Sequence, residues 1–145
     1  MKIKIEKLTL NDIEKYKALM DECFDGSNDI KYYKDNYKDD ANYTIIVAKD
    51  NDKIVGSITF YTIDLFTFSF QPALEIFNVA VLVEYRGKKI AKELFNYIFT
   101  YAKENKYKSI YLTCLSDAYP AHRLYESLGF KKAPSDKYSI KVEDI

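Results

Sequence analysis

The chain has 145 residues, of which 48% are hydrophobic and 16% are aromatic. This length allows one ordinary domain with a hydrophobic core, and this composition excludes a disordered chain. Basic and acidic residues number 22 each, so no global positive field favours nucleic acid as a partner.

Two further absences narrow the classes of function. The cysteines Cys23 and Cys114 and the lone His122 form no cluster with metal-ligand spacing, so we expect no metal site and reduced thiols. The N-terminus alternates charged and apolar residues, unlike a signal peptide, and no stretch approaches the ~18 apolar residues of a membrane span. We therefore expect a cytoplasmic enzyme or binding module without a membrane partner.

The first part of the chain predicts one strand, two helices and a hairpin. Period-two alternation predicts a strand over residues 2–8, and apolar residues at helical spacing predict a helix from Ile13 to near Gly26. Residues 28–39 predict a polar second helix or an irregular segment. The apolar runs 43–48 and 54–61, joined by a turn, predict an antiparallel hairpin.

The second part predicts alternating strands and helices. Residues 62–72 carry alternating phenylalanines but end in proline, so we treat them as a connection. Strands are predicted from Leu74 to Val83 and from Ser109 to Leu115, with an amphipathic helix over 88–106 between them. A short helix over 120–128 has proline at its start and glycine after its end, and residues 130–142 predict one or two closing strands. The order predicts an α/β layer with a mixed sheet.

The turn EYRGKKIA, between the strand ending at Val83 and the helix beginning near Lys88, is the first candidate for chemistry. Such a turn directs several unpaired N–H groups and the positive end of the helix dipole at one spot, which favours anions. Alone, the same residues also fit a solvated basic turn. A second segment, AHRLYESLGF at residues 121–130, follows a buried strand and favours the anion-binding interpretation.

These two segments carry a family resemblance. Residues Phe77 through Leu94 resemble the cofactor-binding motif of the GNAT superfamily of N-acetyltransferases, and AHRLYESLGF resembles that superfamily's next motif. The resemblance covers nearly the whole chain and implies one acyl-CoA N-acyltransferase domain over residues 1–145. The implied fold is α/β, with a mixed, mostly antiparallel central sheet of six to seven strands flanked by about four helices.

The resemblance also implies an activity. It points to transfer of an acetyl group from acetyl-CoA to a primary amine of a small molecule or peptide, by direct attack in a ternary complex. Acetyl-CoA is then the acyl-donor co-substrate, and no metal is needed. A homodimer is compatible with the sequence, although nothing in it specifies one.

In the family, a six-residue turn binds the pyrophosphate of acetyl-CoA through backbone amides, and here the matching residues are Arg86, Gly87, Lys88, Lys89, Ile90 and Ala91. Lys89 stands where glycine is usual, and we expect it in the first helical turn with φ below zero. The main-chain groups of Val79 and Val81 match those that pair with the pantetheine arm. Ala118 stands at the position of the family's usual asparagine, preceded by Ser116 and Asp117, and Ser116 is the candidate cofactor contact there.

Two residues are candidates for proton transfer. Tyr125 matches the family's tyrosine that protonates the departing CoA thiolate, although a packed aromatic on a short helix is the alternative. Many relatives have a glutamate base at the position of Phe77, and Glu75, two residues earlier, lies on the same face of a regular strand. Glu75 is therefore the candidate base, with a solvated glutamate as the alternative. His122 is interpreted as a histidine on a helix surface and Cys114 as a small core residue.

Two other functions stay open at this point. A non-catalytic acyl-CoA sensor is the main alternative, because Phe77 replaces the usual acid, whereas a sensor has no leaving group for Tyr125 to protonate. Nucleic-acid binding through the RGKK segment is opposed by the zero net charge.

The resemblance implies that the acceptor pocket is built from residues 20–40 and 62–72. These segments supply aromatic and acidic side chains, which suit a small cation with an apolar body. They are Tyr32, Tyr33, Tyr37, Phe66, Phe68, Phe70, Asp35, Asp39 and Asp40.

Overall fold

The computed structural model describes residues 1–26, 28–64 and 66–145, in two compact units, residues 1–113 and 114–145. The first unit contains a five-stranded sheet in the order β1-β2-β3-β4-β5. Its strands are β1 (Ile3–Lys7), β2 (Tyr43–Asp50), β3 (Lys53–Ile63), β4 (Ala73–Val81) and β5 (Ser109–Leu112). Neighbours from β1 to β4 are antiparallel, whereas β5 runs parallel to β4.

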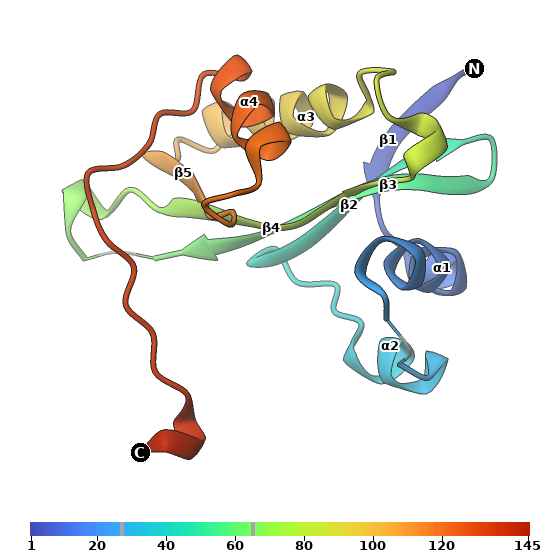
Figure 1. The fold of residues 1–145 in the computed structure, drawn as a ribbon, viewed down its shortest axis with the longest axis horizontal. Helices are drawn as coiled ribbons and strands as arrows, with labels where there is room; N and C mark the ends of the chain where they lie inside the picture. The colour runs from blue at the N-terminus through green and yellow to red at the C-terminus, as the bar shows by residue number, and fades with distance from the viewer. Residues whose placement is uncertain (27, 65) are drawn as a thin grey trace. The chain divides into compact units, whose positions relative to one another are not determined.

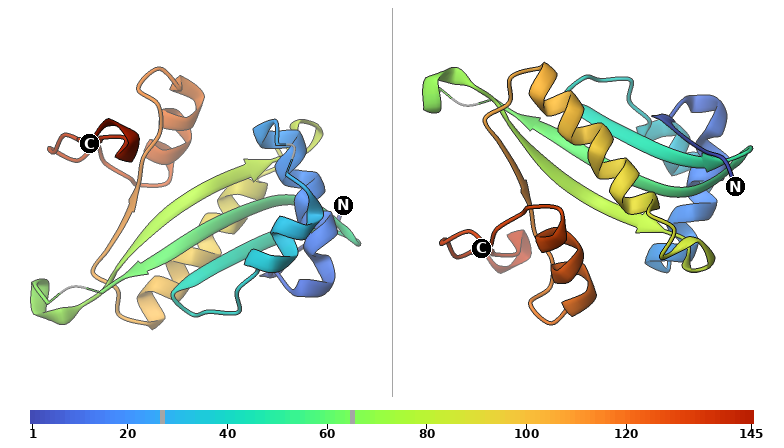
Figure 2. Two further views of the ribbon diagram at one scale, coloured as in Figure 1. Left: turned by 90° about the horizontal axis from the view of Figure 1, so that it is seen from below. Right: turned by 90° about the horizontal axis from the view of Figure 1, so that it is seen from above.

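Helices cover both faces of this sheet. α1 (Ile13–Phe24) and α2 (Ile30–Asn36) lie on one face, and α3 (Ile90–Glu104) crosses the other (Figures 1 and 2). Each long helix buries one apolar stripe at helical spacing, which is why the sequence folds this way. The buried residues are Ile13, Tyr16, Leu19 and Met20 in α1, and Ile90, Leu94, Phe95, Ile98 and Ala102 in α3.

A bulge interrupts β4 near the middle of its length. Asn78 has a left-handed φ of 53°, and the pairing with β3 shifts register at this point, between Ser57 and Thr59. Asparagine is one of the few residues other than glycine that tolerates this conformation readily. Before the bulge β4 pairs with both neighbours, because β5 accompanies it as far as Ile76, opposite Leu112.

The second unit contains α4 (Tyr119–Ser127), with Pro120 at its first turn and Gly129 in a left-handed conformation, φ 99°, beyond its end. The prediction of closing strands over residues 130–142 is wrong for this structure, as is a sheet of six to seven strands. Among the described residues the sheet has five strands. A strand needs the N–H and C=O groups of a partner, and here Tyr138 and Ile140 stay 91% and 70% exposed.

Element boundaries differ in smaller ways. β5 ends at Leu112 rather than Leu115, so Cys114 lies beyond the strand and is half-buried. α3 begins at Ile90 rather than Lys88. No helix in the described parts of the chain has both the length and the hydropathy needed to cross a membrane.

Candidate functional site

The turn between β4 and α3 has a defined conformation. Val83–Tyr85 form one turn of 3-10 helix, Gly87 has φ 76°, and Lys89 precedes α3 with φ 65°. The expectation that Lys89 lies inside the helix with φ below zero is therefore wrong. Lys89 is the residue at which the chain reverses into the helix, which explains in physical terms why glycine suits this position.

The amides of this turn are unsatisfied. The Arg86 amide donates a hydrogen bond to the Val83 carbonyl at 3.1 Å. The next backbone amide along the described chain that donates to a carbonyl is that of Glu93, which binds the Lys89 carbonyl, also at 3.1 Å. Among the described residues, the amides from Gly87 to Lys92 donate to no backbone carbonyl, and no side chain caps the helix. These amides and the helix dipole make the turn suitable for an anion such as a pyrophosphate.

Side chains hold the turn against the sheet. The Tyr85 hydroxyl donates to an Asp50 carboxylate oxygen at 2.7 Å, and this hydrogen bond raises the pKa of Tyr85. The Lys88 ammonium lies 5.2 Å from the centroid of the Tyr85 ring, a cation–π distance. Asp50 ends β2, so the turn is tied to a strand two places away from β4.

Gly56 allows the N-terminus of α3 to approach the sheet closely. A Cβ atom at this position would lie 3.1 Å from both the Ala80 carbonyl oxygen and Ile90 Cγ2. Ile90 itself is 1% exposed, so its side chain anchors the helix in the core. Because the Ile90 side chain is buried, Ile90 can contact a ligand only through its main-chain groups.

The edge of β4 is open beyond the bulge. The Leu82 amide donates to the Val55 carbonyl of β3 at 2.9 Å, so the alternation of an antiparallel pair turns the main-chain groups of Val81 away from β3. Arg86 Nε confirms this direction by donating to the Val81 carbonyl at 3.3 Å. Val79, two residues earlier, points the same way, and no described strand pairs with β4 on this side.

Glu75 lies in a cleft of about 570 Å³ on the face that carries α1 and α2. Phe77 lines the same cleft, so the expectation that the two side chains share a face is confirmed. The Phe77 ring is 39% exposed and makes an edge contact with Tyr61, at 5.2 Å between centroids. The full lining is Tyr43, Thr59, Tyr61, Thr62, Ile63, Glu75, Phe77 and Asn78.

A second cleft, of about 440 Å³, adjoins it under α1 and α2. Its lining is rich in tyrosine and consists of Ile13, Tyr16, Met20, Phe24, Gly26, Asn28, Tyr32, Tyr33, Asn36, Tyr37, Lys38, Tyr43, Ile45 and Asn78. Burial raises the pKa of Tyr16 to about 12, so this hydroxyl remains neutral at physiological pH. Tyr43 and Asn78 line both clefts, which makes the two spaces neighbours.

The expected acceptor segments contribute unequally to these clefts. From residues 62–72 only Thr62 and Ile63 line one, whereas Phe66 and Phe70 are 93% and 69% exposed and contact each other. Among the described residues, none of the expected aspartates lines the tyrosine-rich cleft. Asp39 pairs with Lys7, and Asp40 accepts a hydrogen bond from the Asn42 amide. Ser27, Leu65 and the side chain of Phe68 lie outside the described residues.

The second unit holds the remaining predicted residues. Tyr125 is half-buried on α4, its ring lies 6.2 Å from that of Phe130, and burial raises its pKa. His122 Nε2 lies 3.0 Å from the Leu115 carbonyl oxygen, and Cys114 Sγ lies 3.6 Å from the same nitrogen. His122 is thus half-buried and engaged locally rather than free on a helix surface. Ser116 is exposed in the turn before α4.

Two residues of the site were not expected from the sequence. Asn78 forms the bulge, and its only signal was a polar residue inside an otherwise apolar strand. Gly56 had a clearer signal, because glycine within a strand often marks a close approach of another backbone or helix. Asn78 and Gly56 shape the site through the conformation and close approach of the backbone, which residue types alone do not reveal.

Comparisons with known proteins identify the family. Residues 13–130 match the sequence model described as "Acetyltransferase (GNAT) family". Human N-acetyltransferase 8B is 30% identical over 105 residues, which are 72% of this chain and 46% of that protein. The chain thus spans less than half the length of the curated relatives that it matches.

Solved structures agree at the level of the fold. Glucosamine-6-phosphate N-acetyltransferase from Arabidopsis thaliana superposes with a TM-score of 0.84 at 20% identity, over 98% of this chain and 99% of that one. AAC(6')-Iy in complex with a bisubstrate analogue of CoA gives 0.83 at 12% identity, over 97% and 99%. With a family match across most of its length, the chain belongs to the acetyltransferase (GNAT) family.

Proposed function

We propose that this chain transfers an acetyl group from acetyl-CoA to a primary amine, by direct attack of the amine in a ternary complex. The observation that carries the proposal is the continuity of β4 with the turn that follows it. Unpartnered amides from Gly87 to Lys92 would bind the pyrophosphate. The edge at Val81 and Val79 would pair with the pantetheine arm once the exposed Arg86 side chain releases the Val81 carbonyl.

This arrangement directs the thioester toward the Glu75 cleft. The four residue steps from Val81 back to Phe77 span about 13 Å along a strand, so an arm paired with this edge ends beside the bulge. There the cleft lined by Glu75 and Phe77 opens on the face that carries α1 and α2. The acceptor amine enters from that side and the cofactor from the strand edge.

The chemistry requires two proton transfers. An alkylamine is largely protonated at neutral pH, and Glu75 accepts this proton directly or through water before the nitrogen attacks the thioester carbon. The tetrahedral intermediate collapses with cleavage of the C–S bond, and the thiolate leaves. Tyr125 then donates its phenolic proton to the sulfur, and burial of this phenol keeps it protonated well into alkaline pH.

The proposal treats residues 1–145 as one acyl-transfer domain. Tyr125 and Ser116 belong to the second unit. Both lie inside the family match over residues 13–130, and the resemblance of residues 121–130 to a family motif supports Tyr125 as the general acid, with Ser116 proposed as a cofactor contact. The protein would act in the cytoplasm and need no metal, because a thioester is already activated toward an amine.

A cofactor sensor remains the second candidate function, and Phe77 is the observation that favours it. Its ring presents an apolar surface in the cleft at the position where many relatives have the acid. A sensor would bind acetyl-CoA without consuming it.

Release of CoA from acetyl-CoA in the presence of a panel of amines, including peptides with free N-termini, separates the two. The enzyme predicts equal amounts of CoA and acetylated amine for at least one member of the panel. Tight binding of acetyl-CoA with no acetylated product from any amine would contradict catalysis and favour the sensor. The relatives' names include quite different acceptors, so the panel must be broad.

A further inference from the structure

The charges that line the two clefts are few and well separated. In the tyrosine-rich cleft Lys38 supplies the single charged side chain among the described lining residues, and no carboxylate lines this space. In the adjoining cleft Glu75 is the single charged residue among those that the structure describes. An occupant of both clefts therefore meets a carboxylate at one end and an ammonium at the other.

Lys38 is not neutralised by the protein. It forms no ion pair with the described carboxylates, and its Nζ lies over the Tyr43 ring, 5.5 Å from the centroid. Lys7 and Lys34, by contrast, pair with Asp39 and Glu14 at 2.7 Å and 3.7 Å. Lys31, on α2, also forms no ion pair with the described carboxylates, but of the two lysines only Lys38 lines the cleft.

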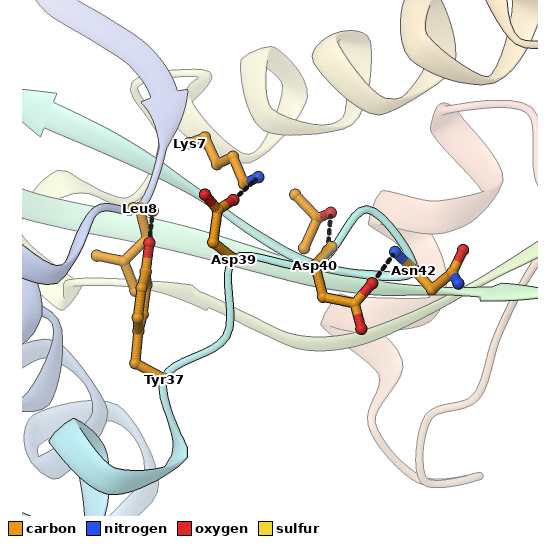
Figure 3. A network of polar contacts seen from close by, with 7 residues as sticks. Lys7, Leu8, Tyr37, Asp39, Asp40 and Asn42 are labelled. Carbon is orange, nitrogen blue, oxygen red and sulfur yellow. Dashed lines mark hydrogen bonds and ion pairs between the residues drawn. The ribbon is translucent and has the colours of Figure 1, made fainter.

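The loop that carries Lys38 is fixed on both sides (Figure 3). On one side the Tyr37 hydroxyl donates to the Leu8 carbonyl at 3.4 Å, and on the other Asp39 binds Lys7. Further along, Asp40 accepts a hydrogen bond from the Asn42 amide at 2.9 Å. These contacts place the Lys38 backbone beside the cleft before any ligand binds, which lowers the ordering cost of binding.

A row of aromatic rings joins Lys38 to Glu75. The rings of Tyr43 and Tyr61 lie 4.7 Å apart between centroids, and Tyr61 is directly opposite Glu75 in the β3–β4 register. With cross-strand neighbours about 5 Å apart, the ammonium and the carboxylate are separated by roughly 10 to 15 Å. The surface between them is apolar and aromatic.

We propose that the acceptor amine carries a carboxylate at its far end, separated from the amine by an apolar body, and that Lys38 binds this carboxylate. The proposal rests on the acetyl-transfer function above, because Glu75 defines the amine end. The body packs against Tyr43 and Tyr61. This replaces the expectation of a small cation, since no described acid lines the tyrosine-rich cleft.

Three probes built on one benzylamine scaffold test this. In para-(aminomethyl)benzoate the ring separates the amine from a carboxylate, the corresponding benzamide is a neutral isostere, and benzylamine lacks the group altogether. Calorimetry with CoA present measures their affinities without requiring turnover. Because Lys38 is exposed and exposed ion pairs are weak, we expect the benzoate to bind about threefold to fivefold more tightly than the benzamide.

Two variants assign the preference to one residue. Lys38→Gln should bind the benzoate and the benzamide equally, whereas Lys34→Gln, on α2 but outside both clefts, should retain the parent's preference. High salt should weaken the preference in the parent. Equal or tighter binding of the neutral probes by the parent, or an unchanged preference in Lys38→Gln, overturns the proposal.

The outcome is distinct from that of the acetyl-transfer test. If acetyl-CoA binds and none of these three probes is acetylated, the affinities still decide the role of Lys38, and the broader amine panel decides the acetyl-transfer function. If probes are acetylated without regard to the carboxylate, the enzyme stands and the role of Lys38 fails.

Discussion

At the scale of single residues, the replacement of an acid by Phe77 determines how this site would handle the amine proton. Glu75 lines the same cleft as Phe77 and lies opposite Tyr61. A carboxylate is therefore present in the cleft, two residues before Phe77 on the same face of the strand. The mechanism therefore depends on whether that displaced carboxylate reaches the proton, directly or through water.

Glu75→Gln tests this dependence. We expect kcat/KM to fall at neutral pH and to recover as the pH approaches the pKa of the free amine, about 10 for an alkylamine, because the nucleophile then arrives deprotonated. Acetyl-CoA affinity should stay unchanged. If the pH profile of kcat/KM is the same for the variant and the parent, the enzyme binds only the small fraction of the amine that is already neutral. Phe77→Glu is a second test of the same point. A higher rate in this variant would show that the absence of a carboxylate at position 77 limits the rate of the parent.

Tyr125→Phe removes one hydroxyl and keeps the ring. If the phenol protonates the leaving thiolate, kcat should fall about 100-fold, within the usual range for a positioned acid. Because burial raises the pKa of Tyr125 above its ordinary value of about 10, the parent should lose activity by deprotonation of this residue only at still higher pH. A rate within twofold of the parent would assign the proton to solvent or another group.

Lys89 provides a test of backbone conformation. Its φ of 65° is unfavourable for residues with a Cβ, so Lys89→Gly should have a free energy of unfolding about 1 kcal/mol larger than Lys89→Ala. Both variants remove the charged side chain, so their difference reports the backbone alone. At an ordinary helical position glycine would be the less stable of the two, and that order in urea denaturation would contradict the assigned conformation.

At the scale of elements, the contact between β3 and the start of α3 positions the turn. Gly56→Ala places a methyl group 3.1 Å from the Ala80 carbonyl and from Ile90. We expect destabilisation of about 1 to 3 kcal/mol and a weaker affinity for acetyl-CoA, because the helix must move outward. Gly26→Ala is the control, since its nearest neighbour is the Asp21 carboxylate, the end of a side chain. Unchanged affinity for acetyl-CoA in a folded Gly56→Ala variant would show that the contact between β3 and α3 does not position the turn.

The elements show how far periodicity reaches. The stripes of α1 and α3 and the hairpin of β2 and β3 follow from residue spacing, because burial on one face produces that spacing. The bulge at Asn78 and the reversal at Lys89 do not follow from residue spacing. Each depends on the backbone conformation of one residue, and asparagine and lysine can both adopt other conformations. Residues 130–142 were predicted to form one or two closing strands, yet in the described part of the chain no strand pairs with them.

At the scale of the whole molecule, the segment proposed to bind the cofactor could be located from the sequence, whereas the lining of the tyrosine-rich cleft could not. The motif from Phe77 to Leu94 is continuous in sequence, so its residues stay together in the fold. The tyrosine-rich cleft combines α1, α2, β2 and Asn78, and its charge depends on which acids find partners elsewhere. Asp39 illustrates this, because its pairing with Lys7 removes it from the lining.

Calorimetric titration of acetyl-CoA into the parent and into Gly87→Pro tests the central claim most directly. Gly87 has φ 76° and open space around its α-carbon, so proline, fixed near −65°, would remove an amide and reverse the local conformation without a steric clash in the core. We predict saturable binding by the parent and loss of most of that affinity in a variant that remains folded. Equal affinity in both proteins would contradict pyrophosphate binding by this turn.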